Sequence, residues 1–297
     1  MMALPGRYEN VSLWDISAAY PYTMKNMEFP RRFVHYRRKM SIPRGVQGFA
    51  RAEVTGGTPD QYGPLPVRVG EQISYPSVLD AEVGIWSLTE LQAAEDSGEY
   101  AVKIKEAWIG EGNAVLFNQT WYDHILEGRA LPGIAGKLAK LTSVATWGGF
   151  MIQGGGEWIE FGEQGEIERV ADGKKLRPLC WPIAALVTGA VRSRLYSEGL
   201  TQDFCFAAHT DGGIYSSSHA PSPLSSGTID SRAGQWRLKA RASAIDLLSP
   251  QVYRYWESET GQVRHVVSGA PERIATQIFA LRMRQAIREG RYHNAAA

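Results

Sequence analysis

Two aspartates, Asp15 and Asp211, stand where apolar, strand-like runs end, and they are the first sign of chemistry in this sequence. Asp15 closes the run LWD, and Asp211 lies in HTDGG directly after FCFAA. Two carboxylates about 4 Å apart repel by roughly 4 kcal/mol at an effective dielectric near 20, so such a pair keeps a proton or binds a hard cation such as magnesium. Two ions about 4 Å apart can clamp the attacking and leaving oxygens of a phosphoryl transfer.

Each aspartate also has a purely structural interpretation. An acid before an apolar-periodic segment often caps a helix. Ser17 can serve as that cap, with Pro21 tolerated in the first helical turn, which leaves Asp15 without a structural task. Asp-Gly is common in hairpin turns, so Asp211 taken alone reads as a turn residue. Both alternatives stay open at this point.

The composition limits the class of protein. The chain has 297 residues, 44% hydrophobic and 21% charged, which is ordinary for a soluble globular protein. Its formal net charge of +1 creates no global positive field, so any nucleic-acid surface must be local. Two cysteines, Cys180 and Cys205, are too few for a disulfide framework or a structural zinc site. Without a signal-peptide pattern or a membrane-length apolar run, we expect a cytoplasmic protein.

The elements that position the aspartates read as a mixed fold with a largely antiparallel sheet, the α+β class. A capping box of Ser87 and Glu90 predicts a helix that ends at Gly98. The remaining expectations are strands at 49–55 and 100–109, a helix from Pro132 to about 150, a glycine-rich hairpin at 154–173, a buried helix from Pro182 to about Tyr196, two strands around 210–213, a Ser/Pro-rich loop at 218–229, and an amphipathic helix at 271–290 with Arg273, Arg282, Arg284 and Arg288 on its polar side.

Three stretches, in order, resemble the motifs of family B DNA polymerases. DISAAYP (15–21) resembles motif A, D-x-x-S-L-Y-P; KLAKLTSVATWGGF (137–150) resembles motif B, K-x-x-x-N-S-x-Y-G; and HTDG (209–212) resembles motif C, D-T-D-S. The segments between them and after them are similar in order and spacing to the protein-primed subgroup of linear phages and linear plasmids. The resemblance therefore covers nearly the whole chain.

The resemblance implies an α+β polymerase core: a palm with an antiparallel sheet backed by helices, short helical fingers and a partial thumb. The implied parts are a first palm part with motif A and an insertion (1–125), a fingers-like helix and glycine-rich hairpin (126–178), a second palm part with motif C (179–256) and a partial thumb (257–297). The implied activity is template-directed addition of deoxynucleotides to a primer 3′ end, in a bacterial or phage-infected host cytoplasm. Because only fourteen residues precede Asp15, we expect no 3′–5′ exonuclease domain and no intrinsic proofreading.

The resemblance also assigns a metal site and partners. Asp15, Asp211 and the carbonyl of Ile16 match the ligands of two Mg²⁺ ions, for which Mn²⁺ is able to substitute. The implied partners are a DNA primer-template and deoxynucleoside triphosphates, and the resemblance allows a terminal priming protein and a separate exonuclease or processivity subunit.

Lys140 matches the motif B lysine that contacts the triphosphate. If 129–140 form one helix, Arg129, Lys137 and Lys140 share a face, and such a face neutralises charge in phosphoryl transfer. The bland alternative is a solvated basic face. Trp147-Gly148 stands in place of Tyr-Gly and implies a ring stacked on the nascent base pair with a glycine allowing close approach.

Tyr20 matches the tyrosine on which the incoming sugar packs, so its ring would exclude a 2′-hydroxyl. Pro21 is expected to lock its own φ and to push Tyr20 out of the helical region. The structural alternative is that Tyr20 is a core aromatic residue beside a helix start.

A basic run, RRFVHYRRK (31–39), interleaves cations with Phe33 and Tyr36, a pattern that can neutralise phosphates and stack on unpaired bases. A solvated charge run is the alternative. The DNA-binding residues expected from this run and from the position of the family's K-x-Y motif are Arg31, Arg32, Arg37, Arg38, Tyr253 and Arg254.

The sequence departs from the family at His209, Gly212, Val144 and Gln251, which stand in place of aspartate, serine, asparagine and lysine. His209 is expected to be structural or DNA-facing, since magnesium prefers oxygen ligands. These losses favour a second hypothesis, a non-catalytic polymerase-like replication protein that binds DNA or a partner. A third, a metal nuclease of ribonuclease H type, requires three or four clustered carboxylates, and no third acid is evident.

Overall fold

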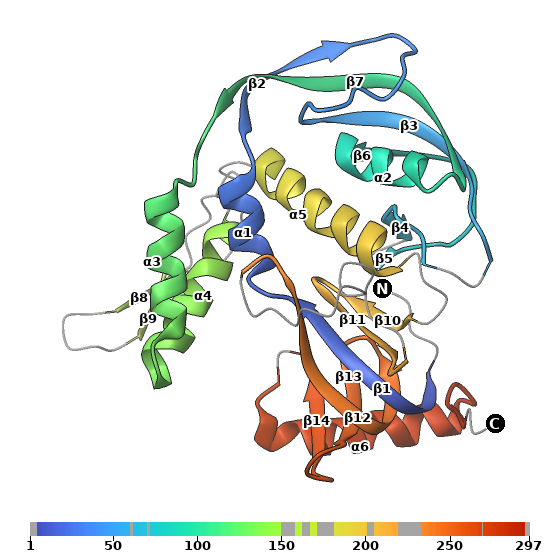
Figure 1. The fold of residues 1–297 in the computed structure, drawn as a ribbon, viewed down its shortest axis with the longest axis vertical. Coiled ribbons are helices and arrows are strands. Elements are labelled where there is room, and N and C mark those ends of the chain that lie inside the picture. The colour runs from blue at the N-terminus through green and yellow to red at the C-terminus, as the bar shows by residue number, and fades with distance from the viewer. Residues whose placement is uncertain are drawn as a thin grey trace. The chain divides into compact units, whose positions relative to one another are not determined.

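The protein is described here from a computed structural model of residues 1–297 (Figure 1). The residues that the structure describes are 5–59, 62–69, 72–149, 158–161, 167–170, 181–200, 205–218, 233–268 and 270–294.

Helices and strands alternate irregularly along the chain (Figure 1). The helices are α1 (Ala19–Asn26), α2 (Leu88–Asp96), α3 (Gln119–Ala130), α4 (Gly133–Gly149), α5 (Trp181–Leu195), the π-helix η1 (Tyr196–Leu200) and α6 (Glu272–Arg288). The strands are β1 (Gly6–Ile16), β2 (Phe29–Tyr36), β3 (Gly48–Gly56), β4 (Val67–Val69), β5 (Gln72–Ser74), β6 (Leu79–Ser87), β7 (Tyr100–Ala114), β8 (Trp158–Phe161), β9 (Ile167–Val170), β10 (Cys205–His209), β11 (Gly212–Ser216), β12 (Trp236–Ser249), β13 (Val252–Glu257), β14 (Val263–Val267) and β15 (His293–Asn294).

The chain divides into two compact units, each built from separate segments. The larger unit comprises residues 1–19, 30–112 and 189–297, and the smaller comprises 20–29 and 113–188. The implied palm, fingers and thumb boundaries stay predictions.

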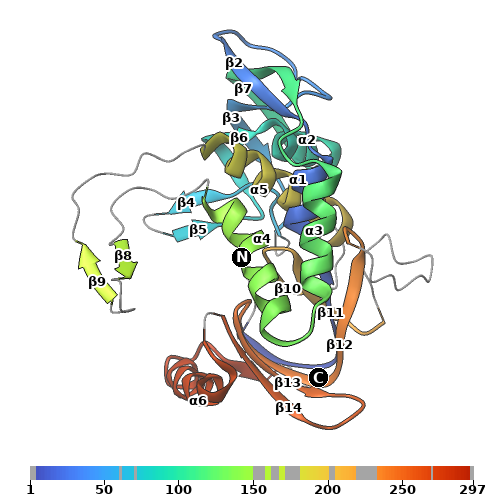
Figure 2. The ribbon, with the colours of Figure 1, turned by 90° about the vertical axis from the view of Figure 1, so that its left-hand side faces the viewer.

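One sheet of the larger unit has the strand order β10-β11-β1-β12-β13-β14, and these neighbours pair antiparallel. The short strand β15 pairs with β1 in parallel. Val11, Leu13, Ile214 and Ile245 form the buried core of this sheet. Helix α6 packs along β13 and β14 through Phe279 and its neighbours (Figure 2).

The second sheet of the larger unit has the order β2-β7-β3-β6, and helix α2 covers one of its faces (Figure 2). The capping box predicted at the start of α2 is confirmed: the Glu90 amide donates to Ser87 Oγ (3.3 Å), and the Ser87 amide donates to Glu90 Oε2 (3.1 Å). Because two of the free amides at the helix start are satisfied in this way, the helix begins where the sequence indicates.

Helices α3 and α4 of the smaller unit are separate and pack on each other, so the condition under which Arg129, Lys137 and Lys140 would share one helix face is not met. Leu131 ends α3 in an extended conformation (φ −65°, ψ 142°). Pro132 explains the break, because a proline disfavours the helical region for the residue before it and has no amide to donate. Gly128 permits the close packing, since a Cβ there would lie 2.9 Å from Ala139 Cβ.

Most predicted elements with a local signal are confirmed: the strands at β3 and β7, the helices α2, α4, α5 and α6, and the hairpin of β10 and β11. Strands β8 and β9 pair antiparallel inside the predicted glycine-rich hairpin. Arg282, Arg284 and Arg288 are exposed on α6, as predicted. Almost all of the predicted Ser/Pro-rich loop lies outside the described residues.

Glu90 gives the first testable expectation, because it both caps α2 and forms a buried ion pair. Its Oε1 lies 2.7 Å from Arg192 Nη2, and its side chain is 3% exposed. Glu90→Ala removes the cap and leaves Arg192 as a largely buried, unpaired cation, so we expect a loss of about 3–5 kcal/mol in the free energy of unfolding. The free energy of unfolding is measured by urea denaturation, with circular dichroism as the signal.

The matched control is Glu95→Ala on the same helix, whose partner Arg44 is exposed, so its loss should stay below about 1 kcal/mol. Equal losses in the two variants would contradict the structural role of the buried pair.

Candidate functional site

Three strands of one sheet bring Asp15 and Asp211 together. Asp15 is paired with Gly212 across β1 and β11, and Gly212 is paired with His209 across the β10–β11 hairpin. Asp211 therefore occupies the hairpin turn beside the end of β1. The amide of Ile16 donates to the carbonyl of Asp211 at 2.7 Å, which ties the two strand ends to each other.

Gly212 makes this close approach possible. A Cβ at this position would collide with the carbonyl oxygen of Trp14 and lie 3.0 Å from the Cα of Asp15. Only glycine avoids a collision with the backbone here. The departure from serine at this position therefore has a structural reason in this chain.

Arg237 is the partner of Asp15 that the sequence analysis missed. It lies opposite Asp15 across β1 and β12, and its guanidinium donates to both carboxylate oxygens, from Nε to Oδ1 at 3.1 Å and from Nη2 to Oδ2 at 3.0 Å. The hydrogen bonds that Arg237 donates to Asp15 raise the pKa of Arg237, and the charge of Asp211 adds to this effect. A bidentate arginine holds a carboxylate in a fixed orientation.

His209 carries no charge at neutral pH. Burial, and to a smaller extent the positive charge of Lys239, lower the pKa of His209 to about 4, while the charge of Asp15 opposes the shift. The half-buried ring lies at the hairpin, 3.1 Å from where a Cβ of Gly212 would be. A neutral imidazole at this point leaves the aspartates as the negative charges of the site.

The turn behind Asp15 differs from the one expected. Tyr20 is helical, in the second position of α1, so the expectation that Pro21 pushes it out of the helical region is wrong. The sharp turn is made by Ala18, which adopts a positive φ of 49°. Pro21 fits in the first helical turn, because the amides there have no partner within the helix.

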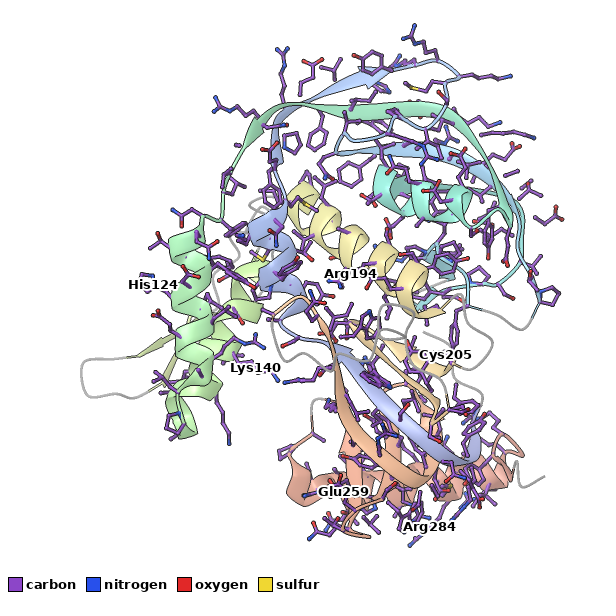
Figure 3. The ribbon with its side chains drawn as sticks, viewed as in Figure 1. His124, Lys140, Arg194, Cys205, Glu259 and Arg284 are labelled. Atoms are coloured by element: carbon purple, nitrogen blue, oxygen red, sulfur yellow. The ribbon has the colours of Figure 1, made fainter. Side chains whose placement is uncertain are left out.

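The cations of the smaller unit lie on two helices. Lys137 and Lys140 are exposed on α4, and Figure 3 labels Lys140. Arg129 on α3 donates to Ser143 Oγ at 3.1 Å, and Ser143 Oγ donates to the carbonyl of Lys140 at 2.7 Å. Arg129 therefore reaches the turn that carries Lys140, although the two residues do not share a helix. Trp147 and Gly148 lie in the last turn of α4, and the side chain of Trp147 lies outside the part that the structure describes.

The arginines of the basic run, on β2 and directly after it, are exposed, as a DNA-binding surface requires, but one of them is paired with an acid. Arg31, Arg37 and Arg38 are exposed, whereas Arg32 donates to Glu111 at 2.6 Å. The guanidinium of Arg38 lies 5.8 Å from the centroid of the Tyr36 ring.

Two further residues with an expected DNA contact are held inside the protein. Tyr253 is 3% exposed in the sheet core. Arg254 donates to Asp246 at 2.7 Å, and its guanidinium lies over the rings of Trp256 and Phe279. Their contact with a primer strand stays a prediction. In the structure Tyr253 belongs to the core of the sheet, and Arg254 pairs with a buried aspartate.

Within the described part of the chain, no group of three or more His, Cys, Asp or Glu side chains is arranged to hold a metal ion. No helix among the described residues has the length and apolar character to cross a membrane.

The sequence comparisons find nothing: no protein-family model matches the chain, and no curated protein matches it. The comparison with solved structures finds phi29 DNA polymerase. Its orthorhombic crystal form matches with a TM-score of 0.70 and 14% sequence identity, over 91% of this chain and 52% of that chain. Phi29 DNA polymerase complexed with primer-template DNA and incoming nucleotide substrates matches with a TM-score of 0.69 and 13% identity, over the same shares.

This chain thus spans about half the length of the polymerase that it matches. At this level of identity the likeness shows the fold. The mixed α/β chain, with its antiparallel sheets, has the fold of a part of a DNA polymerase.

Proposed function

We propose that this chain is the polymerase core of a protein-primed family B DNA polymerase, which adds deoxynucleotides to a primer 3′ end as a template directs. The observation that carries the proposal is the meeting of Asp15 and Asp211, tied by the Ile16–Asp211 hydrogen bond, in a chain with the fold of half of phi29 DNA polymerase. In this proposal the sheet around β1 belongs to the palm, α3 and α4 to the fingers, and α6 to a partial thumb.

The residues at the strand ends fit a magnesium site. Both carboxylates supply the hard oxygen ligands that Mg²⁺ prefers, and they come from backbone positions joined by a hydrogen bond. Arg237, 3.0 Å from Asp15, marks this place as one where positive charge is stabilised. Asp15, Asp211 and the carbonyl of Ile16 would hold two Mg²⁺ ions, or Mn²⁺ in their place. Such ions supply charge neutralisation at the attacking and leaving oxygens.

The remaining roles belong to residues of the smaller unit. Lys137 and Lys140 are exposed cations that would neutralise the triphosphate of the incoming nucleotide, and Arg129 would support the turn that carries Lys140. Tyr20 would pack under the sugar and exclude a 2′-hydroxyl. Trp147, with Gly148 beside it, would stack on the nascent base pair.

The proposed partners follow the solved polymerase complexes. Primer-template DNA and incoming nucleotides are bound in those complexes, and we extend both to this chain. The exposed arginines on β2 and directly after it would add electrostatic attraction to the DNA backbone. A terminal priming protein and a separate processivity subunit complete the proposal, in a bacterial or phage-infected host cytoplasm.

Arg237 favours a second candidate function, a non-catalytic polymerase-like replication protein. The guanidinium already satisfies both oxygens of Asp15, and His209 stands where the family has an acid. Under this alternative the wild-type chain binds primer-template DNA but adds no nucleotide in the presence of Mg²⁺ or Mn²⁺. Primer extension by the purified chain therefore separates the two functions.

Asp15→Asn and Asp211→Asn should each lower the rate of primer extension by at least about 100-fold, roughly 2.7 kcal/mol. The physical reason is that an amide cannot supply the negative charge that holds a divalent cation. The Asp15→Asn variant should fold, because Arg237 is 45% exposed and stays hydrated without its partner. A gel-based extension assay with Mg²⁺ and with Mn²⁺ measures the rate.

Asp123→Asn, at an exposed position on α3, is the matched control and should extend at the wild-type rate. Near wild-type extension by both site variants would remove the aspartates from catalysis.

Tyr20→Val should raise the relative use of ribonucleotides at least tenfold, about 1.4 kcal/mol of lost discrimination, because it opens space beside the sugar. Addition of dATP should fall only modestly. The quantity to measure is the ratio of kcat/KM for dATP to that for ATP. Tyr20→Phe keeps the ring and should keep the ratio, and an unchanged ratio in an active Tyr20→Val variant would exclude Tyr20 from the sugar pocket.

A further inference from the structure

Arg237 supplies the two aspartates with a cation from the chain itself. It lies opposite Asp15 where β1 and β12 pair (Figure 1), and its guanidinium donates to both oxygens of that carboxylate, at 3.1 and 3.0 Å. The negative charge of Asp211 also acts on the guanidinium. Two carboxylates close together repel each other unless a cation lies beside them. Arg237 is therefore a counter-cation of the pair.

The two oxygens that accept from Arg237 are also the ones that Asp15 would offer to a divalent ion. Mg²⁺ binds carboxylate oxygens, and Mn²⁺ has the same preference. An ion on either oxygen would bring a double positive charge next to a guanidinium that stays charged at every pH of interest. The ion and Arg237 therefore cannot both hold Asp15 at full strength.

The side chain of Arg237 is free to leave while its strand stays in place. The guanidinium is partly exposed, so water hydrates it once it has left the carboxylate. The start of β12 is anchored by other groups: the indole of the buried Trp236 donates to Glu198 at 2.8 Å, and the amide of Ser17 donates to the carbonyl of Gln235 at 2.8 Å. A rotation of one side chain is thus enough to open Asp15.

We propose that Arg237 competes with the divalent ion for Asp15 and thereby weakens metal binding by this chain. In one state the guanidinium holds the carboxylate, and in the other the ion holds it and the guanidinium lies in water. An ion shifts this equilibrium only by the affinity that remains after the ion pair is broken. The inference rests on the proposed function for the identity of the ion, and it names the residue that sets its affinity.

The test is the binding of Mn²⁺ to the purified chain without DNA or nucleotide, with the free ion measured by electron paramagnetic resonance. Arg237→Gln should bind Mn²⁺ at least tenfold more tightly than the wild type, because a neutral amide does not repel the ion. Adding Asp15→Asn to this variant should remove the gain, which assigns it to this carboxylate.

Thermal unfolding, followed by circular dichroism, is the second measurement and also shows that the variants fold. In the presence of a chelator, Arg237→Gln should unfold at a lower temperature than the wild type, because the two carboxylates have lost their counter-cation. At 1 mM Mn²⁺ the Tm of the variant should rise by more than that of the wild type, since a tighter ligand stabilises the folded state more. A larger rise in the wild type would contradict the competition.

Arg264→Gln is the matched control. Arg264 lies 3.2 Å from Glu257, and its side chain is 43% exposed, close to the value for Arg237. The control therefore removes the same charge from a similar ion pair in the same sheet, away from the aspartates. Its affinity for Mn²⁺ should equal that of the wild type.

The outcomes separate this inference from the proposed function. If neither the wild type nor Arg237→Gln binds Mn²⁺ through Asp15, both are overturned. Equal affinity in the wild type and a folded Arg237→Gln overturns the competition alone, as does an equal gain in Arg264→Gln, because the effect would then follow net charge. Binding by Arg237→Gln with none in the wild type supports the competition and counts against the proposed function, since the natural chain would then lack its ion.

Discussion

The pairing of β1 with β11 on one side and β12 on the other is the constraint on which the candidate site depends. It sets Asp15 opposite Gly212 and Arg237 at once, and the Ile16–Asp211 hydrogen bond closes the arrangement. A slip of one residue in either register would turn the Asp15 carboxylate to the other face of the sheet. The buried side chains of Val11 and Leu13 oppose such a slip, because it would bring them to solvent. Core packing therefore sets the position of a polar site.

Local signals account for what the sequence predicted well. The Ser87–Glu90 capping box and the Asp-Gly turn at 211–212 act within four residues, so their physical effect is visible in a short stretch of sequence. Long-range contacts account for what it missed. Asp15 and Arg237 are 222 residues apart, and no spacing rule links them. The helical conformation of Tyr20 was missed because Ala18, a residue with no turn preference, makes the turn.

The chain has almost equal numbers of basic and acidic residues, and many of its cations form ion pairs with carboxylates. These carboxylates lie on neighbouring strands or helices: Arg192 pairs with Glu90, and Arg254 pairs with Asp246. Burial makes such pairs expensive to break, since the cation that remains is poorly hydrated. Positions where a cation stays without a partner are therefore more informative about ligands than the total number of basic residues.

Strand β1 is far in sequence from β11 and β12, and this distance sets how early the site can form during synthesis. At about 5–20 residues per second, the ribosome needs on the order of 10–45 s to reach Arg237 after it has made Asp15, which lies 222 residues earlier. For that time β1 is an apolar strand with neither neighbour, and unpaired strand edges of this kind are prone to aggregate. Burial of β1 between β11 and β12 is therefore a late event in the synthesis of this chain.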